Sequence, residues 1–199
     1  MHYPKSIKKL VEQFSKLPTV GPRTAERYVF YLLKQNKEYL GEFSEAIAKL
    51  KSDIKICKSC GAVAEKDICD ICSDKSRNYS VLCIVANTRD MITIEDTHEF
   101  SGVYHILGGL IDQINDVGPD RLNIKNLLSR ISQNKISEVI IALNPTIEGE
   151  TTSMYLQKIL SETKVNISRI ARGLPAGSDI EYADNITISN ALKYRNKLK

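Results

Sequence analysis

The sequence predicts an α/β protein in several parts: a small all-α unit, a cysteine-bearing segment, and a mainly parallel sheet with flanking helices. In the first quarter of the chain, apolar residues recur at helical spacing. From about residue 79 onward, short β-branched runs alternate with helical segments. This alternation predicts a parallel sheet, because a parallel connection leaves room for a helix. Four cysteines within sixteen residues separate the two regions.

Residues 1–53 make up the all-α unit in this interpretation. Apolar spacing predicts helices over 5–17, 22–34 and 41–52. The segment 18–22 reads Pro-Thr-Val-Gly-Pro and cannot continue a helix. Its second proline suits the first position of the next helix, where its missing N–H costs nothing. We therefore expect two helices joined by a tight hairpin, followed by a third helix.

The net charge of +4 is concentrated in this first unit. Residues 1–53 hold ten Lys or Arg against six acids, so the remaining 146 residues are neutral as a whole. A basic end on a neutral body is typical of a protein that binds a polyanion. A solvated helical face is the alternative, and charge by itself does not separate the two.

The rest of the chain divides into three parts: a short polar segment at 54–78, a sheet region at 79–172 and a tail at 173–199. In the sheet region, strands are predicted at 79–86, 103–107, 138–143 and 165–171, with helices at 88–96, 120–133 and 149–162. The tail begins with a Gly/Pro-rich stretch and is predicted to end as a β-then-α pair.

The cysteines predict one structural zinc ion, held by Cys57, Cys60, Cys69 and Cys72. Each pair is a C-x2-C knuckle that aims two thiolates at one metal, and two knuckles supply the four sulfurs of a closed zinc site. Four protein ligands leave no position for water or substrate, which argues against a catalytic metal. Redox or disulfide chemistry and an iron–sulfur cluster are the alternatives. Cys83 lies in an apolar run and is predicted to be a core residue.

The segment 17–25 resembles a helix–hairpin–helix motif, which binds the DNA backbone. Unpaired N–H groups at a hairpin and helix N-terminus, here at Gly21, form an anion site for a phosphate. Arg23 and Arg27 are four residues apart and so share one helix face. Such contacts make binding sequence-tolerant and salt-sensitive. Thr19 stands where the motif usually has glycine, and an ordinary αα-hairpin or a dimerisation surface is the alternative.

The segment 144–150, which reads NPTIEGE, follows a predicted strand and resembles the acidic end of a Toprim domain. That magnesium-dependent fold needs clustered carboxylates at its strand ends. Here Asn144 and Thr146 stand at two of those acidic positions, and Ala86 stands at a third. Only Glu148 and Glu150 remain, so we expect a protein that is not an enzyme. A magnesium-dependent nuclease or primase-like enzyme is the alternative.

The order of these motifs resembles the RecR family of bacterial recombination mediators. The stretches that carry the resemblance are LPTVGPRTAER, the cysteine set, NPTIEGETT, and RIARGLPAGSDIEYAD with the ISNALKYR helix. The resemblance covers essentially the whole chain. It departs from the usual pattern at Thr19, at Ala86 and in the loop 108–119, where a Ser-Pro pair and a later glycine are missing.

Membership of this family implies a ring-like DNA clamp, a homodimer or homotetramer that assembles through its two ends. Such proteins act with RecO, and in many bacteria with RecF, to load RecA onto gapped or single-stranded DNA. Carried over by position, Arg23, Arg27 and Gly21 would contact DNA, and Glu148 and Glu150 would lie near RecO. The tail would exchange between protomers.

The sequence also predicts where the protein works. It has no run of 18 apolar residues and no apolar segment followed by a cleavage site at its start. We therefore expect a cytoplasmic protein, associated with the nucleoid and without a membrane partner.

Overall fold

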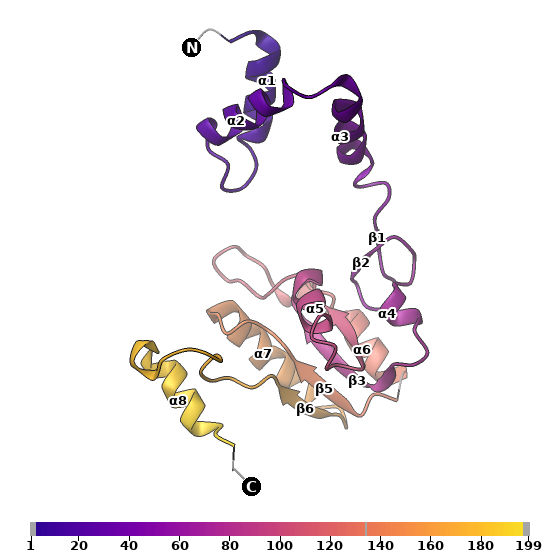
Figure 1. The fold of residues 1–199 in the computed structure, drawn as a ribbon. Coiled ribbons are helices and arrows are strands. Elements are labelled where there is room, and N and C mark those ends of the chain that lie inside the picture. Colours follow the sequence, from indigo (N-terminus) through magenta and orange to yellow (C-terminus); the bar gives the residue numbers. More distant parts are fainter. Residues whose placement is uncertain (1–2, 134, 197–199) are drawn as a thin grey trace. The chain divides into compact units, whose positions relative to one another are not determined.

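The computed structural model describes residues 3–133 and 135–196, which divide into two compact units (Figure 1). The first unit ends at Ile54 and the second begins at Lys55. No helix in the described residues is both long and apolar enough to span a bilayer.

The first unit contains three helices: α1 (Lys5–Phe14), α2 (Pro22–Leu32) and α3 (Lys37–Lys49). Helix α2 buries Ala25, Val29 and Leu32, and Ala25 is fully buried. The three predicted helices are confirmed, with shifted ends. Helix α3 begins four residues earlier than predicted because the Asn36 side chain caps it by accepting from the N–H of Tyr39.

The sheet of the second unit has four parallel strands in the order β4-β3-β5-β6. Their bounds are β3 Asn78–Val85, β4 Gly102–Ile106, β5 Glu138–Ile141 and β6 Asn166–Arg169. All four lie within a residue or two of the predicted strands, and the predicted parallel arrangement is confirmed. Because the strands are parallel, their carboxyl ends lie along one edge of the sheet.

Two apolar clusters cover the two faces of this sheet. On one face, Leu82 and Ile84 of β3 and Val139 of β5 pack in a cluster with α6 (Ile124–Gln133) and α7 (Ile147–Leu160). On the other face, alternate residues of the same strands pack with α5 (Thr88–Glu95) and with the clustered cysteines. The cysteine segment is therefore part of the core of this unit.

The cysteine segment itself is short. It consists of the paired strands β1 (Lys55–Ile56) and β2 (Val63–Ala64), followed by α4 (Asp70–Ser73). A 3-10 turn, Pro119–Arg121, takes up the start of the stretch predicted as a helix over 120–133, so α6 begins only at Ile124.

The outer edge of β4 is satisfied by groups from other elements. The N–H of Ile106 donates to the carbonyl of Cys60 at 2.7 Å, and Asn123 donates to the carbonyl of Ile106 at 3.2 Å. Arg130 donates to the carbonyl of Tyr104, and Arg77 to that of Gly102. An unpaired strand edge invites non-native pairing. Here the cysteine segment and long side chains cover the edge.

The tail differs from its prediction. It contains a 3-10 turn (Ile180–Tyr182) and helix α8 (Asn185–Lys193), and the described residues 173–196 contain no strand, so the predicted β element is wrong. Pro175 has no N–H to donate, and Gly177 has a φ of 79°. The N–H of Ser178 turns back to the carbonyl of Pro175. A strand also requires a hydrogen-bonded neighbour, which this stretch lacks.

Thr19 has a φ of 65°, the left-handed region that glycine adopts without strain. We predict that Thr19→Gly stabilises the protein by about 0.5 kcal/mol or more, the relieved strain exceeding the added entropy of the unfolded chain. Denaturant unfolding followed by circular dichroism measures the change. The control Lys9→Gly, in helix α1, should instead destabilise by roughly 0.7 kcal/mol. A loss of stability in Thr19→Gly would contradict the prediction.

Candidate functional site

The four cysteines of the two knuckles come together in space. All four Sγ atoms lie within 4.8 Å of one another. Cys57 and Cys60 are almost completely buried, Cys69 is buried and Cys72 is half-buried. Cys57 follows β1, whereas Cys69 caps the N-terminus of α4 and Cys72 lies within that helix. Two local turns, separated along the chain, thus converge on one point.

The turn after the first knuckle requires glycine. Gly61 has a φ of 81°, and a Cβ added there would lie 2.8 Å from the Asn123 side chain and 3.1 Å from the carbonyl oxygen of Ile106. This position therefore demands both the conformational freedom and the small size of glycine.

The spacing of the sulfurs fits a single tetrahedral metal. Cys60 and Cys69 have Sγ atoms 3.6 Å apart, and zinc–sulfur bonds of about 2.3 Å place tetrahedral sulfurs about 3.8 Å apart. All five cysteines of the chain are free thiols in the structure. Cys83 is buried in the sheet core, as predicted. A closed set of four thiolates supplies structural cross-linking when zinc is bound.

The helical hairpin of the first unit presents an open helix N-terminus. Gly21 precedes α2 with no side-chain cap, and no acid lies in the first turn. A Cβ added to Gly21 would meet nothing within 4 Å, so the backbone there is accessible. Arg23 and Arg27 are exposed, and neither is within ion-pair distance of a carboxylate in the described part of the chain.

At the carboxyl edge of the sheet, the residues expected in place of Toprim acids have structural roles. The Thr146 side chain caps α7 by accepting from the N–H of Gly149 at 3.1 Å. A Cβ on Gly149 would lie 1.9 Å from the carbonyl oxygen of Asn144, so only glycine fits there. Ala86 is buried at the end of β3.

Of the two remaining acids, only Glu150 is ion-paired in the described structure. Arg169 and Arg172 donate to its carboxylate. No sequence motif indicates a role for these arginines. The pairing of β5 with β6 sets Arg169 beside Ile141 and so places the end of β6 at this edge. In the described residues, neither glutamate belongs to a group of three candidate metal ligands.

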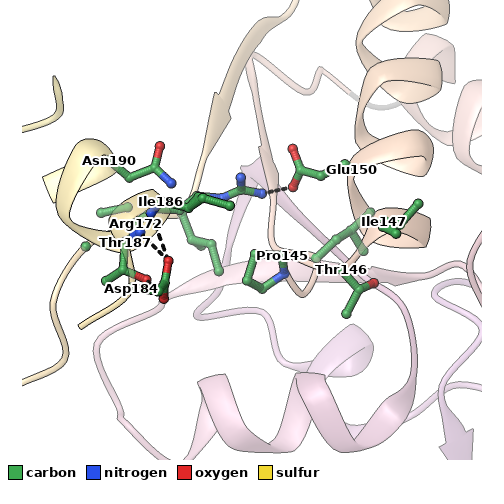
Figure 2. A pocket seen from close by; sticks show the side chains of 13 residues that line it. Pro145, Thr146, Ile147, Glu150, Arg172, Asp184, Ile186, Thr187 and Asn190 are labelled. Carbon is green, nitrogen blue, oxygen red and sulfur yellow. Dashed lines mark hydrogen bonds and ion pairs between the residues drawn. The ribbon is translucent and has the colours of Figure 1, made fainter. Parts of the chain in front are cut away.

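A cavity of about 760 Å³ lies beside this ion pair (Figure 2). Pro145, Thr146 and Ile147 line it from the start of α7, and Arg172 reaches across it to Glu150. Helix α8 contributes Ile186 and Asn190, so the tail and the edge of the sheet share this cavity.

Four protein-family models match the chain in succession. They are the RecR helix-hairpin-helix at residues 7–51, the RecR four-cysteine zinc finger domain at 54–74, a Toprim domain at 80–171 and the RecR C-terminal model at 173–196. Three of the four models describe parts of RecR proteins, and the four occur in the order expected for that family. The chain belongs to the RecR family.

This RecR-family chain therefore has a role as a mediator of recombination and DNA repair, with DNA binding as part of that context. Its mixed α/β architecture agrees with the Toprim match. The zinc-finger match and the four clustered thiols together support one structural zinc ion per chain, as predicted from the spacing.

We predict that Cys57→Ser loses the zinc and much of the stability of the second unit, because the two-residue strands and four-residue helix of the cysteine segment are too short to hold their fold without the metal. Elemental analysis of the purified protein and its melting temperature measure both effects. Cys83→Ala is the matched control, since it removes a buried sulfur outside the cluster. It should keep a full complement of zinc and lose only about 1 kcal/mol. Retention of zinc by Cys57→Ser would refute the assignment of this ligand.

Proposed function

We propose that the protein is a non-enzymatic clamp that binds gapped or single-stranded DNA and acts with RecO, and with RecF where present, to load RecA. The succession of RecR-specific family models along the chain is the observation that carries this proposal. The working form is a ring-like homodimer or homotetramer, closed through the N-terminal unit and the 173–199 tail. As a DNA-binding protein it works in the cytoplasm, at the nucleoid.

The DNA contact in this proposal is the N-terminus of α2. Gly21 exposes backbone, and the first-turn N–H groups carry the positive end of the helix dipole without a competing acid. Arg23 and Arg27 stand on the same helix and have no carboxylate partner in the described chain, so both charges are available to phosphates. Because phosphate contacts do not identify bases, binding is independent of sequence.

The absence of catalysis is part of the same proposal. Asn144, Thr146 and Ala86 occupy places where a Toprim enzyme would have metal-binding acids. The carboxylate of Glu150 is neutralised by Arg169 and Arg172, which compete with any divalent cation for it. Glu148 and the neighbouring surface of α7 then serve as the contact for RecO, with Glu150 held by its arginines beside it.

For the DNA contact, we predict that Arg23→Ala/Arg27→Ala weakens binding and makes the slope of log K against log salt less steep by about 1.4 to 1.8. Two phosphate contacts are lost, and each contributes about 0.7 to the slope on single-stranded DNA and about 0.9 on duplex DNA. Titration of labelled gapped DNA at a series of salt concentrations measures this slope. The control Arg89→Ala/Lys125→Ala removes two cations from the second unit and should leave the slope unchanged. An unchanged slope in the first variant would mean that α2 does not bind DNA.

For the partner contact, we predict that Glu148→Lys lowers the affinity for purified RecO at least tenfold, since it reverses the charge at the start of α7. Glu162→Lys makes the same change beyond the end of that helix and should bind RecO normally. Isothermal titration calorimetry measures both affinities. Equal affinities for the two variants would remove Glu148 from the contact and leave the DNA contact unaffected.

A further inference from the structure

The two faces of helix α2 differ in chemistry. One face supplies the buried residues of the helix, which are Ala25, Val29 and Leu32. The opposite face carries Arg23, Arg27 and Tyr31, which follow one another at four-residue spacing and so lie in a line along the helix surface. Each step of four residues advances about 6 Å along the helix axis. Tyr31 therefore continues the line of the two arginines.

Two of the three aromatic residues of α2 have a packing role. Tyr28 packs edge-on against Phe14 of α1, with ring centroids 5.7 Å apart. Phe30 packs in the same way against Tyr3, at 5.5 Å. These contacts hold α1 and the segment before it against α2. For Tyr31, the third aromatic residue, the described chain offers no packed ring and no cation over its face.

The ring of Tyr31 is open to solvent. The residue is 54% exposed, more than any other Phe or Tyr in the described part of the first unit. Its phenol raises the pKa of Tyr39 on α3, first through the repulsion of a second phenolate and then through a hydrogen bond. A hydroxyl contact engages the rim of the ring and leaves its faces uncovered. A flat apolar surface of this kind gains free energy when another flat ring covers it.

The charges beside Tyr31 favour one kind of occupant. Arg23 and Arg27 are exposed, and neither has a carboxylate within ion-pair distance in the described chain. A second copy that met this face through a two-fold axis would bring arginines against arginines, which like-charge repulsion disfavours. A nucleic-acid strand instead offers phosphates to the arginines and a flat base to the ring.

We propose that Tyr31 stacks on an unpaired base of the strand whose phosphates contact Arg23 and Arg27, and so gives this site a preference for single-stranded over duplex DNA. The inference rests on the proposed DNA contact at the start of α2, and adds to it a group that distinguishes one strand from two. In a duplex the faces of the bases are stacked on one another and are closed to Tyr31. Because every base has such a face, the contact does not select a sequence.

The first test compares the affinities for three DNAs: a single strand, the same strand with abasic residues, and a duplex closed by hairpins at both ends. Tyr31→Leu should weaken binding to the single strand roughly 5- to 100-fold, the usual contribution of one base stacked on an aromatic ring. Binding to the other two DNAs should change by less than about twofold, because neither offers a free base to the ring.

Two further variants serve as controls in the same titrations. Tyr31→Phe keeps the ring and loses only the hydroxyl, so it should retain the preference for single strands. Tyr28→Leu removes a tyrosine from the same helix but from outside the line of arginines, and should also retain it. The melting temperature and the particle mass of each variant are measured alongside.

The second test uses fluorescence. The chain contains no tryptophan, so the emission of Tyr31→Trp comes from this position alone. Stacking on a base quenches tryptophan emission. A saturating single strand should therefore quench Tyr31→Trp strongly, whereas the closed duplex and the abasic strand should leave its emission nearly unchanged.

Two results would overturn the inference. One is an equal loss of affinity of Tyr31→Leu for all three DNAs, which would show that Tyr31 supports the helix and does not stack. The other is an unchanged strand preference together with a changed particle mass, which would assign Tyr31 to a contact between copies of the chain. Failure of the DNA contact itself is a separate outcome, since it appears as an unchanged salt slope in Arg23→Ala/Arg27→Ala.

Discussion

The attachment of the four-cysteine segment to the edge strand β4 is the constraint on which the second unit depends. The segment has only two-residue strands and a four-residue helix, which cannot fold on the strength of their own contacts. A zinc ion bound by both C-x2-C knuckles cross-links the segment and fixes its fold. Because the carbonyl of Cys60 then pairs with Ile106, the closed segment also covers a strand edge that would otherwise be open.

At the carboxyl edge of the sheet, ion pairs and a helix cap take the place of a cluster of acids. A cluster of acids would repel itself without a cation, so the loss of some acids changes the environment of those that remain. Here Arg169 and Arg172 neutralise Glu150, and Thr146 caps the helix on which it lies. A cavity bordered by the tail occupies the same edge.

The hairpin of the first unit combines strain with accessibility. Thr19 takes a backbone conformation that disfavours a β-branched residue, and so keeps the turn tight at some cost in stability. The turn leads directly into Gly21, the residue before α2, and no side chain caps the N-terminus of that helix. An uncapped helix start is unfavourable in water alone and becomes favourable when an anion binds there.

The sequence alone determined the elements that depend on local chemistry, and tertiary structure decided the electrostatics. Helical spacing, β-branched runs and the two knuckles predicted the helices, the parallel sheet and the zinc ligands, because each is specified by residues close together in the chain. The strand predicted in the tail is wrong, because a strand forms only beside a hydrogen-bonded partner, which the local sequence does not specify. Arg169 and Arg172 reach Glu150 only after β5 and β6 pair. These two arginines are 19 and 22 residues from Glu150 in the sequence, and no local pattern relates them to it. The physical reason is that Coulomb attraction depends on the distance between two charges in space, and the pairing of the strands, not the sequence spacing, sets that distance.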